Sequence, residues 1–505
     1  MKIFGGSLVK KNIVANLFGG VVVTILTLVI TPLQIDILGI QSYGVIGFIA
    51  TLQVAFSIFD LGLSSTLTRE LAIDKTPNKS KCHKLIGTVG AVYWIVAIVI
   101  GSLLWIFSES ISQWWFKSED IGQDTLTFSF KVIGLYLGLR WPVSMYIGIL
   151  SGLQRMGALN AIKIAVTITR LGGGLIILLF WKTLDAFLIW IAFSAFLELW
   201  CYWFACKKII PKITLYGNFS FNEIKRIWKY SLGINILSIT GILIIQMDRI
   251  FLSKMGSLEE LGYYTLAYVA VSGIGLILGA INSAAFPWLS ESFHHEDRTE
   301  FLSRYNKSSL AILLIVGLFS AAMIFYSHLV ISLWVNEVTS NHSYLLLTIL
   351  AAGSWISASI ANLYNVAIAS GRPSWHIKVN GILILPYFIC LYIAIKYFGA
   401  IGAALSWLFL NITYVIFLVN PINVEILGLN AKKWLTNIFY PALMTGILAF
   451  LPLKLLAFYL EFSQFKQFLV MVISSLIYVF IGYFVVKTYS NEDLLKDFFL
   501  RYKIK

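Results

Sequence analysis

Charged residues, cysteines and long polar segments are scarce in this chain. Only 12% of its 505 residues are Asp, Glu, Lys or Arg, and its four cysteines are scattered (Cys82, Cys201, Cys206 and Cys390). They lack the spacing of a disulfide framework or a zinc site, so we interpret them as packing residues. No loop between apolar stretches exceeds about 25 residues, which leaves no room for an inserted domain. This excludes a fused ATPase, a soluble glycosyltransferase domain and the large external loop expected of a membrane polymerase.

Motifs that mark enzymes and nucleotide-binding proteins are also absent from the sequence. It has no GxxxxGK[ST] phosphate-binding loop, no HExxH pair, no CxxC pair and no nucleophile elbow. The six histidines fall mostly at the ends of apolar stretches, where a solvated side chain is the ordinary outcome. We therefore expect no catalytic residue, no metal, no cofactor and no direct hydrolysis of ATP.

Hydrophobic residues dominate what is present. They make up 59% of the chain, and the mean hydropathy is +0.83. About fourteen apolar stretches follow one another, each near the roughly 20 residues of helix that span a bilayer core. The sequence therefore predicts an all-α integral membrane protein with fourteen transmembrane helices. The expected spans are 12–36, 43–64, 86–107, 126–150, 158–180, 184–206, 230–252, 264–288, 308–334, 344–369, 376–395, 399–420, 436–457 and 467–487.

The basic residues indicate the topology. Most of the 38 Lys and Arg residues fall in every second loop, and cytoplasmic loops carry the excess of Lys and Arg. An even number of spans with this alternation places both termini in the cytoplasm. The net charge of +14 is spread over these loops and faces anionic lipid, so we expect no nucleic-acid partner. The first apolar run follows Lys10 and Lys11 but is too long for a signal peptide, so we expect it to remain as a span.

Two glycine motifs recur along the chain. Gly39 after the first span and Gly256 after the seventh stand in similar surroundings, as do Gly152 and Gly371 at the inner ends of the fourth and tenth spans. Their shared offset of about 218 positions indicates six spans duplicated in parallel, and parallel repeats place a substrate site at their interface. The predicted domains are an N-lobe at 1–210, a C-lobe at 211–422, and two further spans with a cytoplasmic amphipathic tail at 423–505.

Ionisable side chains inside the spans indicate a functional cavity. Each costs at least ~2.5 kcal/mol in a bilayer, so a functional role is the default interpretation. Arg140 and Arg170 lie within their spans, and Arg170 shares one helical face with Asn160 and Lys163. A guanidinium matches phosphate or carboxylate and keeps its charge when partly desolvated. The candidate substrate-binding residues are Arg140, Arg170, Lys163, Asn160 and Arg249.

Alternative interpretations stay open for several of these residues. Ser, Asn and Thr residues on one helical face can also serve helix–helix packing, and we favour this interpretation for them. For Arg140 and Arg170 we favour a water-filled cavity. Asp248 and Arg249 lie near the outer end of a span, where snorkelling or a local ion pair is an equal alternative to a substrate contact. Glu198 is a candidate counter-ion for one of the arginines. The candidates for coupling transport to a proton or sodium gradient are Asp60, Glu198 and Asp248.

Short motifs across nearly the whole chain resemble those of one transporter family. They are Pro32-Leu33 with Leu38-Gly39 and Tyr43-Gly44, Phe59-Asp60-Leu61-Gly62-Leu63, Gly152-Leu153-Gln154-Arg155, Gln246-Met247-Asp248-Arg249 and Leu261-Gly262-Tyr263-Tyr264. In these motifs the chain resembles the Wzx-type O-antigen and capsule-repeat flippases. These form the polysaccharide-transport branch of the multidrug/oligosaccharidyl-lipid/polysaccharide (MOP) exporter superfamily.

This resemblance implies two six-helix lobes in a V shape around a central cavity, plus two C-terminal helices. It implies alternating access that carries an undecaprenyl-pyrophosphate-linked oligosaccharide repeat unit across the bacterial inner membrane for surface polysaccharide biosynthesis. The expected partners are this lipid-linked substrate, membrane lipids, glycosyltransferases and a polysaccharide polymerase.

Other functions remain as alternatives. A multidrug or metabolite cation antiporter and a lipid II-type flippase share the fold, although cavity arginines would repel cations. A lipid-linked polymerase is an enzyme and would need an ordered external loop. A non-transporting scaffold for a glycan assembly complex would tolerate neutralisation of all buried charges.

Overall fold

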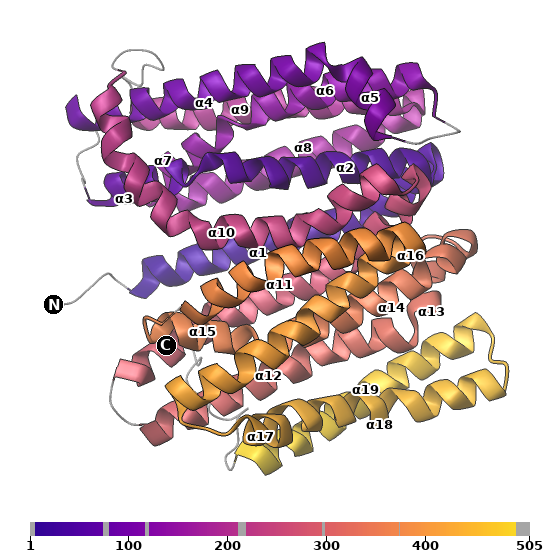
Figure 1. Ribbon diagram of the computed structural model, residues 1–505. Helices are drawn as coiled ribbons and strands as arrows, with labels where there is room; N and C mark the ends of the chain where they lie inside the picture. The colour runs from indigo at the N-terminus through magenta and orange to yellow at the C-terminus, as the bar shows by residue number, and fades with distance from the viewer. Residues whose placement is uncertain are drawn as a thin grey trace. The chain divides into compact units, whose positions relative to one another are not determined.

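The computed structural model describes residues 6–73, 80–116, 121–210, 219–294, 298–372 and 374–490. Throughout these ranges the chain forms helices joined by short turns, without a strand (Figure 1). The prediction of an all-α protein is confirmed. The predicted amphipathic tail, which begins near Asn491, lies outside the described ranges.

Most of the helices can cross a bilayer. Within the described ranges, twelve helical segments are long and apolar enough to span a membrane. They overlap every predicted span except 230–252, which falls in α10 (Phe221–Met255). Large apolar side chains such as Ile106, Phe180 and Phe458 are exposed, as expected of a surface covered by lipid rather than water. The prediction of a multi-pass membrane protein is therefore confirmed.

One long segment holds two predicted spans. α16 (Ser374–Ile422) covers both 376–395 and 399–420, and it departs from helical geometry at Gly399. The φ of Gly399 is 54°, in the left-handed region that glycine adopts without a steric cost. α16 therefore consists of two arms that meet at this glycine, which matches the two predicted spans.

The chain folds into two compact units, Met1–Thr265 and Leu266–Lys505. The first unit holds α1 (Gly6–Leu38), α2 (Ile40–Phe56), the 3-10 helix η1 (Ser57–Asp60), α3 (Leu63–Ile73), α4 (Ser80–Ile106), α5 (Ser108–Trp115), α6 (Gln123–Arg140), α7 (Val143–Gly152), α8 (Met156–Trp181), α9 (Leu184–Ile209) and α10. The second unit holds α12 (Arg298–Phe325), α13 (Ser327–Trp334), α14 (Glu337–Ser359), α15 (Ala361–Ala369), α16, the π-helices η2 (Asn423–Leu427) and η3 (Leu435–Phe439), α17 (Ala431–Trp434), α18 (Tyr440–Tyr459) and α19 (Gln464–Ser490).

The boundary between the units falls inside α11 (Leu258–His294). α10 packs against α2, α3 and α4, so it belongs to the first unit by contact. The predicted lobes at 1–210 and 211–422 follow the repeat in the sequence rather than the packing, and they remain a prediction.

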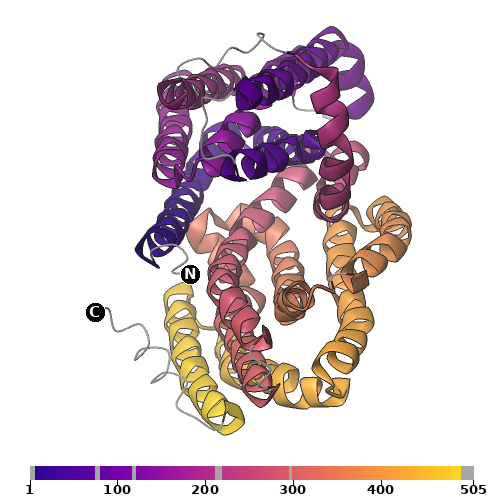
Figure 2. The same cartoon turned by 90° about the vertical axis from the view of Figure 1, so that its left-hand side faces the viewer.

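In the first unit, α9 packs against both α6 and α8. α6 also packs against α4, and α8 against α1. Figure 1 shows α4, α6 and α9 running alongside one another, and Figure 2 views the helices of this unit nearly along their axes. Because α9 contacts two neighbours, residues on α6 and α8 can reach a side chain that α9 presents.

Two spans of the first unit are broken. α2 gives way to η1, and the chain then passes Leu61 and Gly62, whose φ values are 46° and 77°, before α3 begins. α6 ends at Arg140, and α7 begins after Pro142, which lacks the N–H that a continuous helix would need. The predicted span 126–150 therefore consists of two helices, α6 and α7, separated at Pro142.

The segments beyond the breaks, α3 and α7, pack closely together. The hydroxyl of Thr68 donates to the carbonyl of Gly148 at 3.0 Å. A Cβ atom on Gly148 would lie 2.8 Å from the Ser64 carbonyl, so only glycine permits this approach. α3 and α7 therefore pack with their backbones close together.

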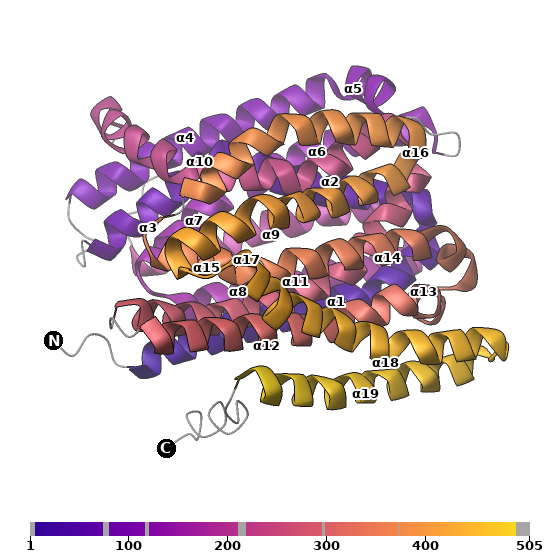
Figure 3. The same cartoon turned by 60° about the horizontal axis from the view of Figure 1, so that its bottom comes forward.

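In the second unit, α12 packs against α14, α18 and α19. α18 and α19 form an antiparallel pair (Figure 3) and α14 packs against α13 and α16. This unit thus has its core around α12 and α14.

Candidate functional site

A tight turn between α8 and α9 brings two predicted site residues, Arg170 of α8 and Glu198 of α9, to the same height along the antiparallel helix pair. Lys182 ends α8 with a φ of 50°, and the Thr183 side chain caps α9 by accepting from the Ala186 N–H at 3.4 Å. Arg170 precedes this turn and Glu198 follows it, each by roughly 20 Å of helix at 1.5 Å per residue. Because the helices are antiparallel, the two side chains meet.

Glu198 bridges Arg140 of α6 and Arg170 of α8. Its Oε1 accepts from Arg140 Nη2 at 3.2 Å, and its Oε2 lies 3.6 Å from Arg170 Nη1. The side chain of Glu198 is 7% exposed, against 18% for Arg140 and 23% for Arg170. The cluster therefore keeps one net positive charge, and its two guanidinium groups are more accessible than its carboxylate.

The strength of these ion pairs follows from their separations. At 3.2 and 3.6 Å, each pair attracts by about 5 kcal/mol at an effective dielectric constant of about 20, before the cost of desolvation. The predicted role of Glu198 as a counter-ion is confirmed, with the difference that it serves both arginines.

Two further residues complete the cluster. Arg140 Nη1 donates to Gln53 Oε1 at 2.6 Å and to Tyr136 Oη at 2.9 Å, and Tyr136 Oη donates to Gln53 Oε1 at 2.6 Å. The sequence offered two signals for them. Gln53 lies on the polar face of its span, and Tyr136 stands one helical turn before Arg140.

The polar residues on one face of α8, Asn160, Lys163 and Arg170, lie in different surroundings. Asn160 is buried, donates to the Met156 carbonyl at 3.0 Å and packs against Gly19 of α1. Lys163 is exposed. Only Arg170, whose carbonyl accepts from the Trp190 indole at 3.0 Å, joins the arginine cluster. The structure thus places Asn160 and Lys163 away from the contacts of Glu198.

Asp60 lies at the first helix break. Its carboxylate accepts from Ser64 Oγ at 2.7 Å and from the hydroxyl of Tyr93. The ring of Tyr93 also lies 6.2 Å from that of Trp141 at the second break. Asp60 therefore ties α4 to the broken segment of α2.

Asp248 and Arg249 form a second buried charged pair. Their side chains are 3% and 7% exposed, and Arg249 Nε lies 3.7 Å from Asp248 Oδ1. Asp248 also accepts from the Arg249 backbone N–H at 2.7 Å and from Tyr264 Oη at 2.5 Å. Of the two interpretations left open by the sequence, this arrangement favours the local ion pair.

The second unit carries a neutral polar cluster. The Asn362 amide donates to Ser308 Oγ at 2.6 Å and to Ser309 Oγ at 3.0 Å, and the Asn365 amide donates to Asn282 Oδ1 at 3.0 Å. Amides and hydroxyls of this kind suit hydroxyl groups rather than ions. No group of three or more His, Cys, Asp or Glu that could hold a metal occurs among the residues that the structure describes.

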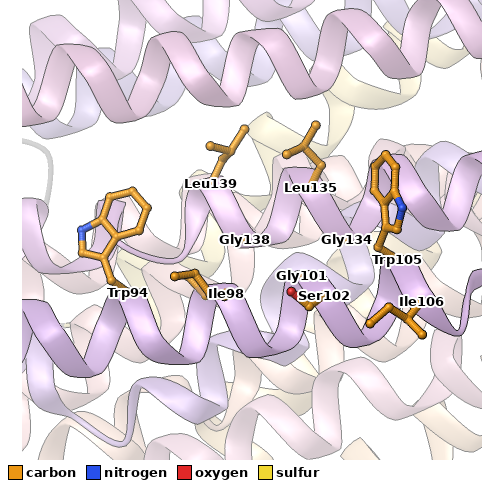
Figure 4. Close-up of a pocket in the computed structure, with 11 residues that line it drawn as sticks. Trp94, Ile98, Gly101, Ser102, Trp105, Ile106, Gly134, Leu135, Gly138 and Leu139 are labelled. Atoms are coloured by element: carbon orange, nitrogen blue, oxygen red, sulfur yellow. The ribbon is translucent and has the colours of Figure 1, made fainter.

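A separate groove of about 360 Å³ lies between α4 and α6 (Figure 4). A Cβ atom on Gly134 would lie 2.9 Å from the Gly101 carbonyl, so glycines allow the two backbones to approach. Trp94 and Trp105 stand at the two ends of the groove, and its lining residues carry no charge. The groove therefore suits hydrocarbon and is distinct from the arginine cluster.

Comparison with known proteins now places the chain in a family. The polysaccharide biosynthesis protein family matches residues 9–293, more than half of the chain. The chain belongs to this family. A Shigella flexneri relative, named as a proposed O-antigen transporter, is 25% identical over 398 residues, which cover 79% of this chain and 93% of the relative. The family resemblance inferred from the sequence is confirmed.

Solved structures of the superfamily share the fold. The lipid II flippase MurJ in an inward closed conformation matches with a TM-score of 0.71 at 15% identity, over 94% of this chain and 98% of the flippase. An inward-facing multidrug resistance MATE family transporter of the MOP superfamily matches with a TM-score of 0.62 at 14% identity, over 81% and 96% of the two chains. The chain therefore has the MOP-superfamily fold of membrane transporters.

Proposed function

We propose that this transporter flips an undecaprenyl-pyrophosphate-linked oligosaccharide repeat unit across the bacterial inner membrane, from the cytoplasmic to the outer leaflet, by alternating access. Arg140 and Arg170 hold the pyrophosphate or an acidic sugar, and the chain catalyses no reaction. The observation that carries the proposal is the arginine cluster, in which one carboxylate is shared by two partly accessible guanidinium groups inside spanning helices.

The physical task explains why a protein is required. A hydrated pyrophosphate and its sugars lose their water when they enter about 30 Å of hydrocarbon. Guanidinium donors replace that water at the anionic group, because they match phosphate oxygens in pairs. Amide and hydroxyl groups inside the spans can offer the same replacement to sugar hydroxyls.

A cation antiporter of the same fold is less well supported. A site for organic cations needs an excess of negative charge, whereas the cluster around Glu198 has two cations and one anion. A lipid II-type flippase carries the same pyrophosphate chemistry, so the cluster does not separate it from a repeat-unit flippase. The sugar moiety distinguishes the two.

The remaining parts of the proposal concern energy and partners. Asp60, Glu198 and Asp248 are the carboxylates through which a proton or sodium gradient would act. Glycosyltransferases on the cytoplasmic side supply the substrate and a polymerase on the outer side consumes it, while membrane lipids surround the helices.

The test is deletion of the gene in the native host, followed by extraction of lipid-linked glycans and assay of surface polysaccharide. We expect accumulated lipid-linked repeat units and loss of surface glycan. Wild-type protein should restore export, Arg170→Gln should not, and Arg155→Ala should restore it, because Arg155 is an exposed arginine at the start of α8. Unchanged glycan pools together with altered resistance to cationic compounds would contradict the proposal and favour the antiporter.

A further inference from the structure

The two arginines of the cluster are held very differently. Arg140 makes three hydrogen bonds, to Gln53 at 2.6 Å, Tyr136 at 2.9 Å and Glu198 at 3.2 Å. Both hydrogens of its Nη1 are used, and the Tyr136 hydroxyl hydrogen closes the triangle on Gln53. The guanidinium of Arg140 is therefore fixed in position and orientation.

Arg170 is held by one loose ion pair. Its Nη1 lies 3.6 Å from Glu198 Oε2, and neither atom makes a hydrogen bond within the described part of the chain. A guanidinium has five N–H donors, and Arg170 is also the more exposed arginine of the two, at 23%. Its side chain can move toward a ligand without breaking a hydrogen bond.

We infer that Gln53 is a positioning residue that fixes Arg140, so that Arg140 is a rigid anchor for the anionic group and Arg170 is the adjustable arm that closes on it. The inference rests on the proposed function of the same site. A fixed donor loses little conformational entropy when a ligand arrives, whereas an ordered Arg side chain costs up to about 2 kcal/mol. Arg140 thus binds the anionic group at a low entropic cost, and Arg170 adapts its position to the shape of the pyrophosphate.

The two roles predict different results for the same substitution. Arg140→Lys removes the planar set of donors on which Gln53 and Tyr136 depend, so it should lower both the unfolding temperature and ligand binding. Arg170→Lys breaks no hydrogen bond of the resting protein, so it should lower binding at an unchanged unfolding temperature. The two variants are matched, because each keeps the positive charge and loses only the planar set of guanidinium N–H donors.

The positioning role of Gln53 is tested by the preference of the site for a diphosphate over a monophosphate. Gln53→Met keeps the length of the side chain but removes the oxygen that accepts from Arg140 and Tyr136. Without a fixed Arg140, the preference for two phosphate groups over one should fall, on the order of tenfold. Ser57→Ala is the control, because the hydrogen bond that Ser57 Oγ makes among the described residues is a local one, to the Val54 carbonyl of the preceding α2 at 2.5 Å.

The experiment measures the affinity of the purified full-length protein for farnesyl diphosphate and for farnesyl monophosphate, together with the unfolding temperature. We expect the wild type and Ser57→Ala to prefer the diphosphate. Gln53→Met should lose this preference and also unfold at a lower temperature, because it leaves the Arg140 and Tyr136 donors without their acceptor. Equal losses of affinity for both probes, or no loss, would overturn the role of Gln53. If Arg140→Lys and Arg170→Lys change the unfolding temperature equally, Arg140 is not a fixed anchor and Arg170 is not an adjustable arm. A wild type that binds neither probe would instead contradict the proposed function.

Discussion

Replacing Glu198 with alanine should destabilise the first unit by about 3–5 kcal/mol, the range for breaking a buried ion pair by removing one partner. The reason lies in the geometry. Glu198 is the shared partner of Arg140 at 3.2 Å and Arg170 at 3.6 Å. Its loss leaves two partly accessible guanidinium groups that repel each other without a carboxylate between them.

The assay is thermal unfolding of the purified full-length protein in detergent, followed by the fluorescence of its 16 tryptophans. A double-mutant cycle with Arg170→Ala isolates the pairwise effect. The double variant should be more stable than Glu198→Ala alone, because it removes one of the two repelling charges. Glu109→Ala serves as the control, since Glu109 is exposed and such substitutions usually change stability by less than about 0.5 kcal/mol.

Two results would refute the reasoning. If Glu198→Ala unfolds at the wild-type temperature, Glu198 does not compensate the arginines. If the double variant is less stable than Glu198→Ala, then Arg170 stabilises the protein by contacts other than this ion pair, and the cluster does not act as an electrostatic unit.

Three other substitutions test the surroundings of the site. Gly148→Leu should cost about 1–3 kcal/mol, because its side chain would overlap the Ser64 carbonyl; a wild-type unfolding temperature would contradict the close packing of α3 on α7. Asp248→Ala should cost about 3–5 kcal/mol, because it leaves Arg249 buried without its carboxylate, and a stable variant in the same thermal assay would refute a structural pair. Lys163→Ala should leave stability at the wild-type level because the side chain is exposed, and export at the wild-type level because Lys163 lies outside the arginine cluster; lost export of surface glycan would show that Lys163 belongs to the site.

The spans were predictable because hydropathy and length are local properties of the chain. Span 126–150 was correctly placed, and its break at Pro142 has a local cause in the sequence, since proline cannot continue a helix. The break after η1 was not foreseen. Its residues Leu61 and Gly62 take left-handed conformations, and a Leu in such a conformation gives no signal in the sequence.

The candidate site was predictable in part. Helical spacing placed Asn160 and Arg170 on one face of α8, but it could not show that the face meets α1 near Asn160 and α9 near Arg170. The shared role of Glu198 depends on how α9 is rotated between α6 and α8, which no single-helix pattern encodes. Tyr136 was missed because an aromatic residue in a span is usually a packing residue, and its hydroxyl partner comes from another helix.

The measurement that tests the account most directly is transfer of a lipid-linked saccharide between leaflets in vesicles that contain the purified protein. The vesicles hold a polyprenyl-pyrophosphate-linked sugar in both leaflets, and a sugar-binding lectin outside the vesicles captures what reaches the outer one. The account predicts complete capture over time with the wild type, and capture of only the outer-leaflet fraction with Arg170→Gln or without protein. Equal capture with the wild type and with protein-free vesicles would contradict it.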